Sequence, residues 1–253
     1  MPAERSDSGF SLIEIIVAVA ILALLAGATA PLVVRNMTAA RRTETTERLR
    51  RLVDGMVGDA AAGRYGYLGD MGNLPPALGD LLVRGGQPAF AISAYGYGVG
   101  WSGPYVQQTQ ALADLTQDAW GVALQYAPGV AQVTSAGEDH VLGTADDLIY
   151  PGSAPPTTGA LAVSVLGIPN TNPSATVALG SVDVGASLSV TSNGVLSTWA
   201  LAGGGPFYSA APIPIGVHAL VVTGAGSYAG ASATQVLTVR SGNNAATVTL
   251  VQP

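Results

Sequence analysis

Apolar residues are distributed along the chain in two contrasting patterns. From Phe10 to Ala30 they form one run in which Glu14 is the only charged residue. At about 1.5 Å per residue, a helix of this length extends about 31 Å, enough to cross a bilayer. The helix is expected to continue beyond Pro31, a residue that removes one helical hydrogen bond, and to end near residue 63. Apolar residues of this second part recur three and four positions apart, as on one helix face: Leu49, Leu52, Val53 and Met56.

The rest of the chain has shorter periods, which predict strands. In the turn-rich stretch 64–152, alternation over 122–126 and again over 130–133, on either side of Pro128-Gly129, predicts a hairpin. From residue 160 onward, short alternating runs are separated by Gly, Pro, Asn and Ser, which is typical of a β-sandwich. The predicted strands are 161–168, 176–182, 187–191, 196–201, 217–223, 235–239 and 246–251.

Composition adds a boundary between these regions. From Gly152 to the end, only Asp183 and Arg240 are charged, and the segment 153–159 has the Pro-rich, small-residue composition of a linker. The net charge of −6 argues against a nucleic-acid partner, and the lack of cysteine rules out disulfides and thiolate sites. We therefore expect an α+β protein with a transmembrane helix, a small antiparallel-sheet head and an all-β sandwich. Its expected parts are a leader (1–9), a transmembrane and stalk helix (10–63), a head (64–152), a linker (153–159) and a C-terminal sandwich (160–253).

The start of the chain carries the most specific motif. Gly9 and Phe10 form a cleavable junction directly before the apolar run, so cleavage there leaves the whole helix on the mature protein, unlike removal of a secretory signal. Glu14 lies four residues further on, and a lone carboxylate at a bilayer centre costs about 2.5–3.5 kcal/mol or more, which implies a partner. A plain signal anchor, with Glu14 near the interface, is the alternative.

Gly9, Phe10 and Glu14 resemble the prepilin pattern of type IV pilins and type II secretion pseudopilins. The resemblance implies that a prepilin peptidase cuts after Gly9 and methylates Phe10, and that Glu14 pairs with the amino terminus of a neighbouring subunit. It also implies that the leader faces the cytoplasm, although the arginines at Arg35 and beyond lie on the side that the positive-inside rule disfavours.

The stretch 135–148 holds the candidate chemistry, four acidic residues within ten positions divided by two glycines. Ca²⁺ binds six to eight oxygen ligands, and clustered carboxylates on a flexible loop can supply them. The spacing does not fit an EF-hand loop. An acidic, solvated turn capped by its own Asp side chains is the alternative.

A second resemblance bears on this loop. Gly-Pro-Tyr, Asp-x-Trp-Gly-x-x-x-x-Tyr and Ser-x-Gly-x-Asp-x-x-x-Gly-Thr-x-Asp-Asp occur in the order typical of the major pseudopilin of type II secretion. The resemblance implies a calcium loop that stabilises the head, with Ala119 standing where the family often has Pro. The implied calcium ligands, besides backbone carbonyls, are Ser135, Asp139, Asp146 and Asp147.

The C-terminal extension departs from that family, whose major pseudopilin ends soon after the calcium loop. The segment 214–222 loosely resembles carboxypeptidase-regulatory-like modules. The sandwich is either a spacer or a binding module, and Trp199, Phe207 and Tyr208 are candidates for a contact patch, with sandwich core favoured for Trp199.

The interpretation is a non-enzymatic filament subunit of a secretion pseudopilus, stabilised by calcium, anchored in the bacterial inner membrane with a periplasmic head. Expected partners are further copies, minor pseudopilins, the inner-membrane assembly platform, prepilin peptidase and membrane lipid. A type IV pilus pilin, a membrane-tethered adhesive sandwich that never polymerises, and a hydrolase using His140 and Asp139 are the alternatives.

Overall fold

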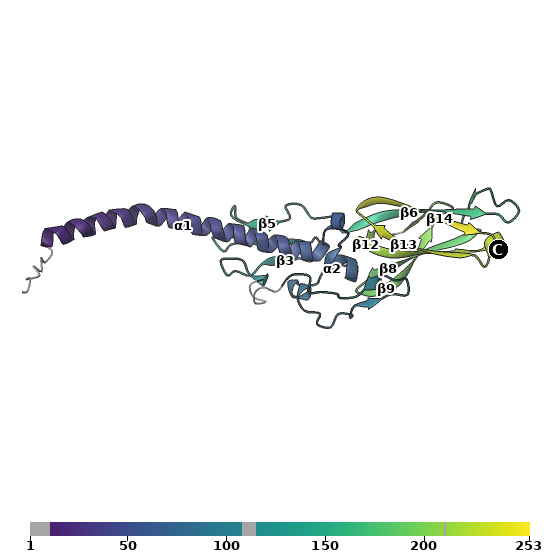
Figure 1. Ribbon diagram of the computed structural model, residues 1–253, viewed down its shortest axis with the longest axis horizontal. Helices are drawn as coiled ribbons and strands as arrows, with labels where there is room; N and C mark the ends of the chain where they lie inside the picture. Colours follow the sequence, from purple (N-terminus) through teal and green to yellow (C-terminus); the bar gives the residue numbers. More distant parts are fainter. Residues whose placement is uncertain (1–10, 108–114, 210) are drawn as a thin grey trace, which may run out of the picture. The chain divides into compact units, whose positions relative to one another are not determined.

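The computed structural model describes residues 11–107, 115–209 and 211–253 and divides the chain into two compact units, Met1–Glu44 and Thr45–Pro253. After Ser11, the described residues of the first unit belong to helix α1 (Leu12–Val57), which stays helical through Pro31 (Figure 1). The apolar side chains of this part of α1 are exposed, with Leu12, for example, 77% accessible. Among the described residues, α1 is the one helix long and apolar enough to cross a membrane.

In the second unit, the last turns of α1 form part of a packed head. Leu49, Leu52 and Met56 are at most 1% exposed, so the predicted apolar face is confirmed as a core face. The helix ends at Val57, earlier than residue 63, because Gly58 adopts φ +70° and a Cβ there would lie 2.3 Å from the Arg64 carbonyl oxygen.

The charged residues in the last turns of α1 lie in two different environments. Arg50 is in solvent: it lies 3.8 Å from Glu47 and 3.6 Å from Asp54, with more than half of each side chain exposed. Arg48, in contrast, is only 8% exposed, and its guanidinium donates a 3.0 Å hydrogen bond to the Gln117 carbonyl oxygen. Its long side chain therefore ties the helix to a loop that lies 69 residues further along the chain.

The head surrounds this part of α1 with short elements. β3 (Gln125–Ala127) and β4 (Gln132–Ser135) form the predicted hairpin, with strand ends displaced by one to three residues, and β5 (Leu148–Tyr150) pairs antiparallel with β4. The acidic loop therefore connects two paired strands. The other elements are η1 (Ala60–Ala62), α2 (Gly66–Met71), η2 (Leu78–Leu81), β1 (Ala91–Ile92) and β2 (Gly98–Val99).

The Gly-Pro-Tyr segment braces the head rather than forming an open site. The Tyr105 hydroxyl donates a 2.9 Å hydrogen bond to Asp70 Oδ2, and Ser102 Oγ donates to the same oxygen. Burial raises the pKa of Asp70, and the two hydrogen bonds act in the opposite direction. Trp101 Nε1 donates to the Asp80 carbonyl oxygen at 2.7 Å, so the segment is held at both ends.

The C-terminal region is the β-rich sandwich expected from the alternating runs. Its strands follow the order β11-β6-β10-β9-β8-β12-β13, with β7 and β14 also paired to β6. All neighbours are antiparallel except β6 and β14, which lie side by side in parallel (Figure 1). The strands are β6 (Thr158–Ile168), β7 (Val177–Ala178), β8 (Val184–Ser192), β9 (Val195–Ala202), β10 (Phe207–Ser209), β11 (Ile213–Pro214), β12 (Gly216–Gly224), β13 (Ser232–Val239) and β14 (Gly242–Val251). A short helix, η3 (Gly226–Tyr228), follows β12.

Alternating residues of these strands fill the main core of the sandwich, in which Val163, Leu188 and Leu220 are fully buried. Full burial of such a side chain contributes about 1.5–3 kcal/mol. Phe207 is 2% exposed and belongs to this core, whereas Tyr208 is 51% exposed. Trp199 packs against the core from a partly buried position, so of the three aromatic candidates only Tyr208 is mainly on the surface.

The sandwich contacts the head directly within the second unit. The buried Tyr97 hydroxyl donates a 3.0 Å hydrogen bond to the Ser189 carbonyl oxygen, and Gly194 N donates to the Met71 carbonyl oxygen at 2.9 Å. Gly72, just after α2, lies so close to β8 that an added Cβ would be 1.8 Å from the Thr191 carbonyl oxygen. The two regions therefore share an ordered contact, in addition to the segment 151–157 that joins β5 to β6.

Candidate functional site

The acidic loop between β4 and β5 is organised by its own carboxylates. Asp146 Oδ2 accepts hydrogen bonds from the backbone amides of Glu138 (2.6 Å) and Asp139 (3.0 Å), and Asp146 Oδ1 accepts one from Thr144 Oγ1 at 2.6 Å. The Thr144 hydroxyl, followed by the backbone amides, lowers the pKa of Asp146 to about 2. Position 137 requires glycine, because a Cβ there would lie 2.5 Å from Asp146 Oδ2.

Two further acids close the tip of the loop. Asp139 Oδ1 accepts a hydrogen bond from Val141 N at 2.8 Å, and Asp147 Oδ2 accepts one from Gly143 N at 2.7 Å. Between them His140 adopts φ +62° with its side chain exposed. The backbone amides of the loop thus compensate much of the negative charge, as in the self-capped turn considered as the alternative to a calcium site.

Asp147 also has an oxygen that is buried without such a donor. Asp147 Oδ1 is buried and has no hydrogen-bond partner in the described part of the chain. A hard cation such as Ca²⁺ would satisfy this carboxylate oxygen, so the donor chemistry fits the ion. In residues 11–107, 115–209 and 211–253, however, no three acidic or histidine side chains are grouped closely enough to hold a metal by themselves. Backbone carbonyls and water would have to supply the other ligands.

Ser135, the fourth ligand implied by the resemblance, has other partners in the structure. It is fully buried at the end of β4, donates a 2.7 Å hydrogen bond to Asp118 Oδ2 and accepts one from Gly137 N at 3.2 Å. The carboxylates of Asp139, Asp146 and Asp147 accept hydrogen bonds from groups of the loop itself. Ser135 instead connects the start of the loop to Asp118, which lies outside it.

Sequence reasoning missed Asp118, which is the acceptor at the centre of this support. Asp118 is 2% exposed, and its Oδ1 accepts hydrogen bonds from the amides of Trp120 (3.0 Å) and Val122 (2.9 Å). The available signal was the Asp-x-Trp-Gly motif, in which an Asp caps the amides two and four residues later, as in an Asx turn. Asp118 therefore couples the tight turn of that motif to the start of the acidic loop through Ser135.

The second candidate site is the N-terminus of α1. Glu14 lies in the first helical turn, is exposed, and is the only charged residue between Ser11 and Val34. Ile15 N donates to the Ser11 carbonyl oxygen at 3.2 Å, which closes the first turn around it. Gly9 and Phe10, the predicted processing residues, lie outside the described residues.

Residues 5–30 match the prokaryotic N-terminal methylation motif. The match covers the predicted cleavage junction, Glu14 and the whole apolar run to Ala30, and it indicates a type IV pilin-like N-terminus. Such N-termini are processed by prepilin peptidase and anchor pilin-like proteins in the membrane before they enter filaments. No curated protein matches the chain.

The methylation motif occupies about a tenth of the chain and says nothing about the head or the sandwich. It gives a reason for the exposed apolar side chains of α1, since lipid before assembly and neighbouring subunits after it can cover them. Glu14 lies within the matched motif, and an isolated carboxylate in such an apolar helix is costly without a cationic partner.

Proposed function

We propose that this chain is a structural subunit of a filament of the type II secretion pseudopilus kind. One observation carries the proposal: the methylation motif matched over residues 5–30 includes Gly9, Phe10 and the apolar run that follows them. In this proposal prepilin peptidase processes the chain in the bacterial inner membrane, and the head lies in the periplasm. Copies then assemble with minor pseudopilins on a membrane platform, and the chain itself turns over no substrate.

The first test is the mass of the amino-terminal peptide from protein isolated from its native membrane or surface fraction. A peptide that starts at Phe10 and carries one additional methyl group is expected. A peptide that starts at Met1, or one cut after the apolar run, would instead make α1 an ordinary anchor or signal. The tethered binding module would then be the better explanation.

The second test concerns Glu14. Its carboxylate is expected to pair with the amino terminus of a neighbouring Phe10, because a positive charge offsets the cost of a carboxylate among apolar helices. Glu14→Ala should therefore block or slow incorporation into filaments while membrane insertion is retained, and Glu14→Asp serves as the matched control that keeps the charge. Normal filament yield from Glu14→Ala would remove the docking argument.

We also propose that calcium stabilises the head through Asp139, Asp146 and Asp147, with Ser135 in support. The buried, unpartnered Asp147 Oδ1 supports a cation at this loop. Replacing both Asp146 and Asp147 by Ala should lower the melting temperature and make it insensitive to a chelator. A chelator response equal to that of the unmodified protein would contradict the site.

The sandwich supports a display function within the same proposal. Between Gly152 and the C-terminus only Asp183 and Arg240 are charged, and Tyr208 presents an exposed aromatic ring. Because the sandwich packs on α2 through ordered contacts, a filament would present it in a fixed orientation.

A further inference from the structure

The sheet that contains β6 and β14 is covered along one side and open along the other. One side of β6 pairs in turn with the short strands β11, β10 and β7. Its other side pairs with β14 over its whole length, from Gly242 opposite Gly159 to Val251 opposite Ile168. Within the described residues, no strand pairs with the far side of β14, which is therefore an edge strand of ten residues.

One hydrogen bond shows which backbone groups face the open side. Gln252 N, directly after β14, donates to the Ile168 carbonyl oxygen at 2.9 Å, so the amides of even-numbered residues face β6. Successive residues of a strand direct their N–H and C=O groups to opposite sides, and the odd-numbered residues of β14 therefore present theirs to the open side. Thr247, Thr249 and Val251 are among these residues, and their side chains are exposed.

This edge lacks the features that usually keep strand edges apart. Natural edge strands often carry charged residues, proline or a bulge, which prevent pairing with another chain. β14 contains no charged residue and no proline, and its pairing with β6 continues from residue to residue without a bulge. Thr247, Thr249 and Val251 are β-branched, a residue type that favours strands. The edge is thus suited to accept a further strand.

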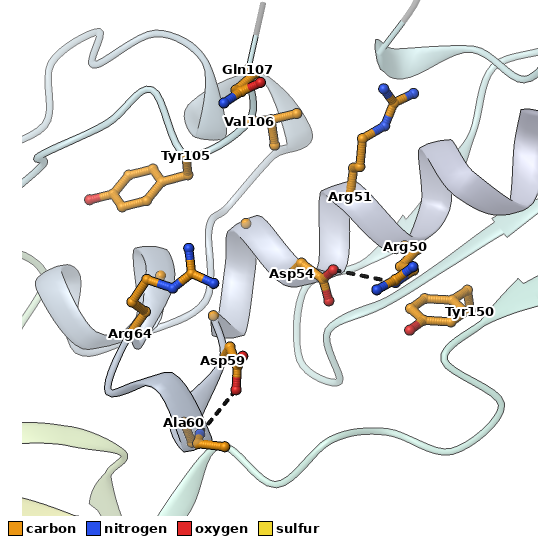
Figure 2. Close-up of a pocket in the computed structure, with 14 residues that line it drawn as sticks. Arg50, Arg51, Asp54, Asp59, Ala60, Arg64, Tyr105, Val106, Gln107 and Tyr150 are labelled. Atoms are coloured by element: carbon orange, nitrogen blue, oxygen red, sulfur yellow. Dashed lines mark hydrogen bonds and ion pairs between the residues drawn. The ribbon is translucent and has the colours of Figure 1, made fainter.

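The distribution of charge indicates which strand fits. The head is charged, as at the hollow of about 980 Å³ at the end of α1, whose lining includes Arg51, Asp54, Asp59 and Arg64 (Figure 2). Covering such a surface with an uncharged strand would remove charges from water without giving them partners, which is costly. The sandwich has only Asp183 and Arg240 as charged residues, and neither lies in β14. The β14 edge of a second copy therefore matches this edge in both backbone pattern and charge.

We propose that the β14 edge pairs antiparallel with the β14 edge of a second copy, about a two-fold axis near Thr247. Thr247 then lies opposite Thr247 of the second copy, and Thr249 lies opposite Ala245, so no charges meet. Because the same edge serves both copies, the contact is isologous and joins two copies rather than a row. It goes beyond the proposed filament function, in which copies dock through Glu14, and does not depend on it.

The test is oxidation of a single cysteine, since the chain has none of its own. Full-length Thr247→Cys is purified in enough detergent to leave one copy per micelle, oxidised and separated on a non-reducing gel. Opposed Cβ atoms in such a pair lie about 4.5–5.5 Å apart, close to the range of a disulfide, so a covalent dimer is expected. Thr234→Cys, at an exposed position of the edge strand β13, is the matched control and should stay monomeric.

Backbone variants show whether strand pairing causes the cross-link. Thr249→Pro, added to Thr247→Cys, removes one N–H from the open side of each copy and should lower the cross-linked fraction by about tenfold or more. Because this N–H faces away from β6, the melting temperature should change little. Thr249→Ala loses the same side chain but keeps the N–H, and it should cross-link as well as Thr247→Cys alone.

The outcomes separate this contact from the proposed function. No dimer from Thr247→Cys, a dimer that survives Thr249→Pro, or equal cross-linking of Thr234→Cys would overturn the contact. A ladder beyond the dimer would also overturn it, because an isologous contact closes. Glu14→Ala, which removes the proposed filament docking, should leave the Thr247→Cys dimer intact, and loss of the dimer would show that it follows helix docking instead. A failure of filament assembly alone would overturn the proposed function and leave this contact standing.

Discussion

Removing the Asp118 carboxylate tests how the acidic loop is supported. In Asp118→Ala, three donors lose their acceptor: the amides of Trp120 and Val122 and the hydroxyl of Ser135. Ser135 is fully buried and Asp118 nearly so, and water therefore cannot easily replace the missing acceptor. A buried donor left without a partner costs about 1–3 kcal/mol.

With the two part-buried amides near the lower end of that range, the expected loss is about 4 kcal/mol in the free energy of unfolding. For a folded unit of this size, 1 kcal/mol corresponds to about 2–4 °C, so the melting temperature should fall by about 8–16 °C. The measurement is thermal unfolding of the full chain in detergent, followed by near-ultraviolet circular dichroism of the head and sandwich aromatics.

Two control variants make the result specific. Asp118→Asn keeps one oxygen for the amides of Trp120 and Val122 and should cost about 1 kcal/mol, since a single hydrogen bond changes. Ser135→Ala removes one donor and should cost about 1–2 kcal/mol, with or without a chelator. An alanine variant as stable as the asparagine variant would refute the three-donor argument. A loss in Ser135→Ala that disappears on chelation would show instead that Ser135 acts through the ion.

Three further predictions follow from single contacts. Gly72 has φ +75°, and an added Cβ would lie 1.8 Å from the Thr191 carbonyl oxygen, so Gly72→Ala should lower the free energy of unfolding by at least about 3 kcal/mol in denaturant titration. An unchanged midpoint would show that the head and the sandwich are not in contact there. Burial lowers the pKa of His218 below 6.5, so the unfolded chain binds more protons than the folded chain, and the free energy of unfolding should fall as the pH drops through 6.5. His218→Leu should make the free energy of unfolding less dependent on pH in this range, and equal pH dependence of the variant and the unmodified protein would argue against this role. The pKa of Asp146 is lowered to about 2, so its contribution to the stability of the loop should be complete above pH 3.8 and lost as the pH falls through about 2. Hydrogen exchange of the Glu138 amide, which donates to Asp146, measures this loss, and a loss near pH 4 would contradict the hydrogen bonds.

The sequence was most informative where local pattern decides the structure. The apolar period of α1 identified Leu49, Leu52 and Met56 as a buried face, because this inference needs no distant partner. Glu14 stood out for the same reason, as the only charge in an apolar run.

The features that the sequence did not reveal depend on partners far along the chain. Arg48 is buried because a carbonyl group 69 residues away accepts its hydrogen bond, and no helical periodicity contains that information. The Tyr97–Ser189 contact joins residues 92 positions apart, so the docking of the sandwich on the head could not be predicted. Strands β10 and β11 were missed because they span only three and two residues among glycines and prolines.

The acidic loop lies between these extremes, and its geometry limits what calcium can do. The motif identified Asp139, Asp146 and Asp147, but only the structure shows that backbone amides and Thr144 already hold the loop closed. An ion bound at Asp147 Oδ1 would therefore stabilise a preformed loop rather than create it. Binding at 100 times the dissociation constant contributes about 2.7 kcal/mol, so chelation should lower the melting temperature by about 5–10 °C and leave the head folded. Complete unfolding of the head on chelation would show that the amide network cannot hold the loop without the ion.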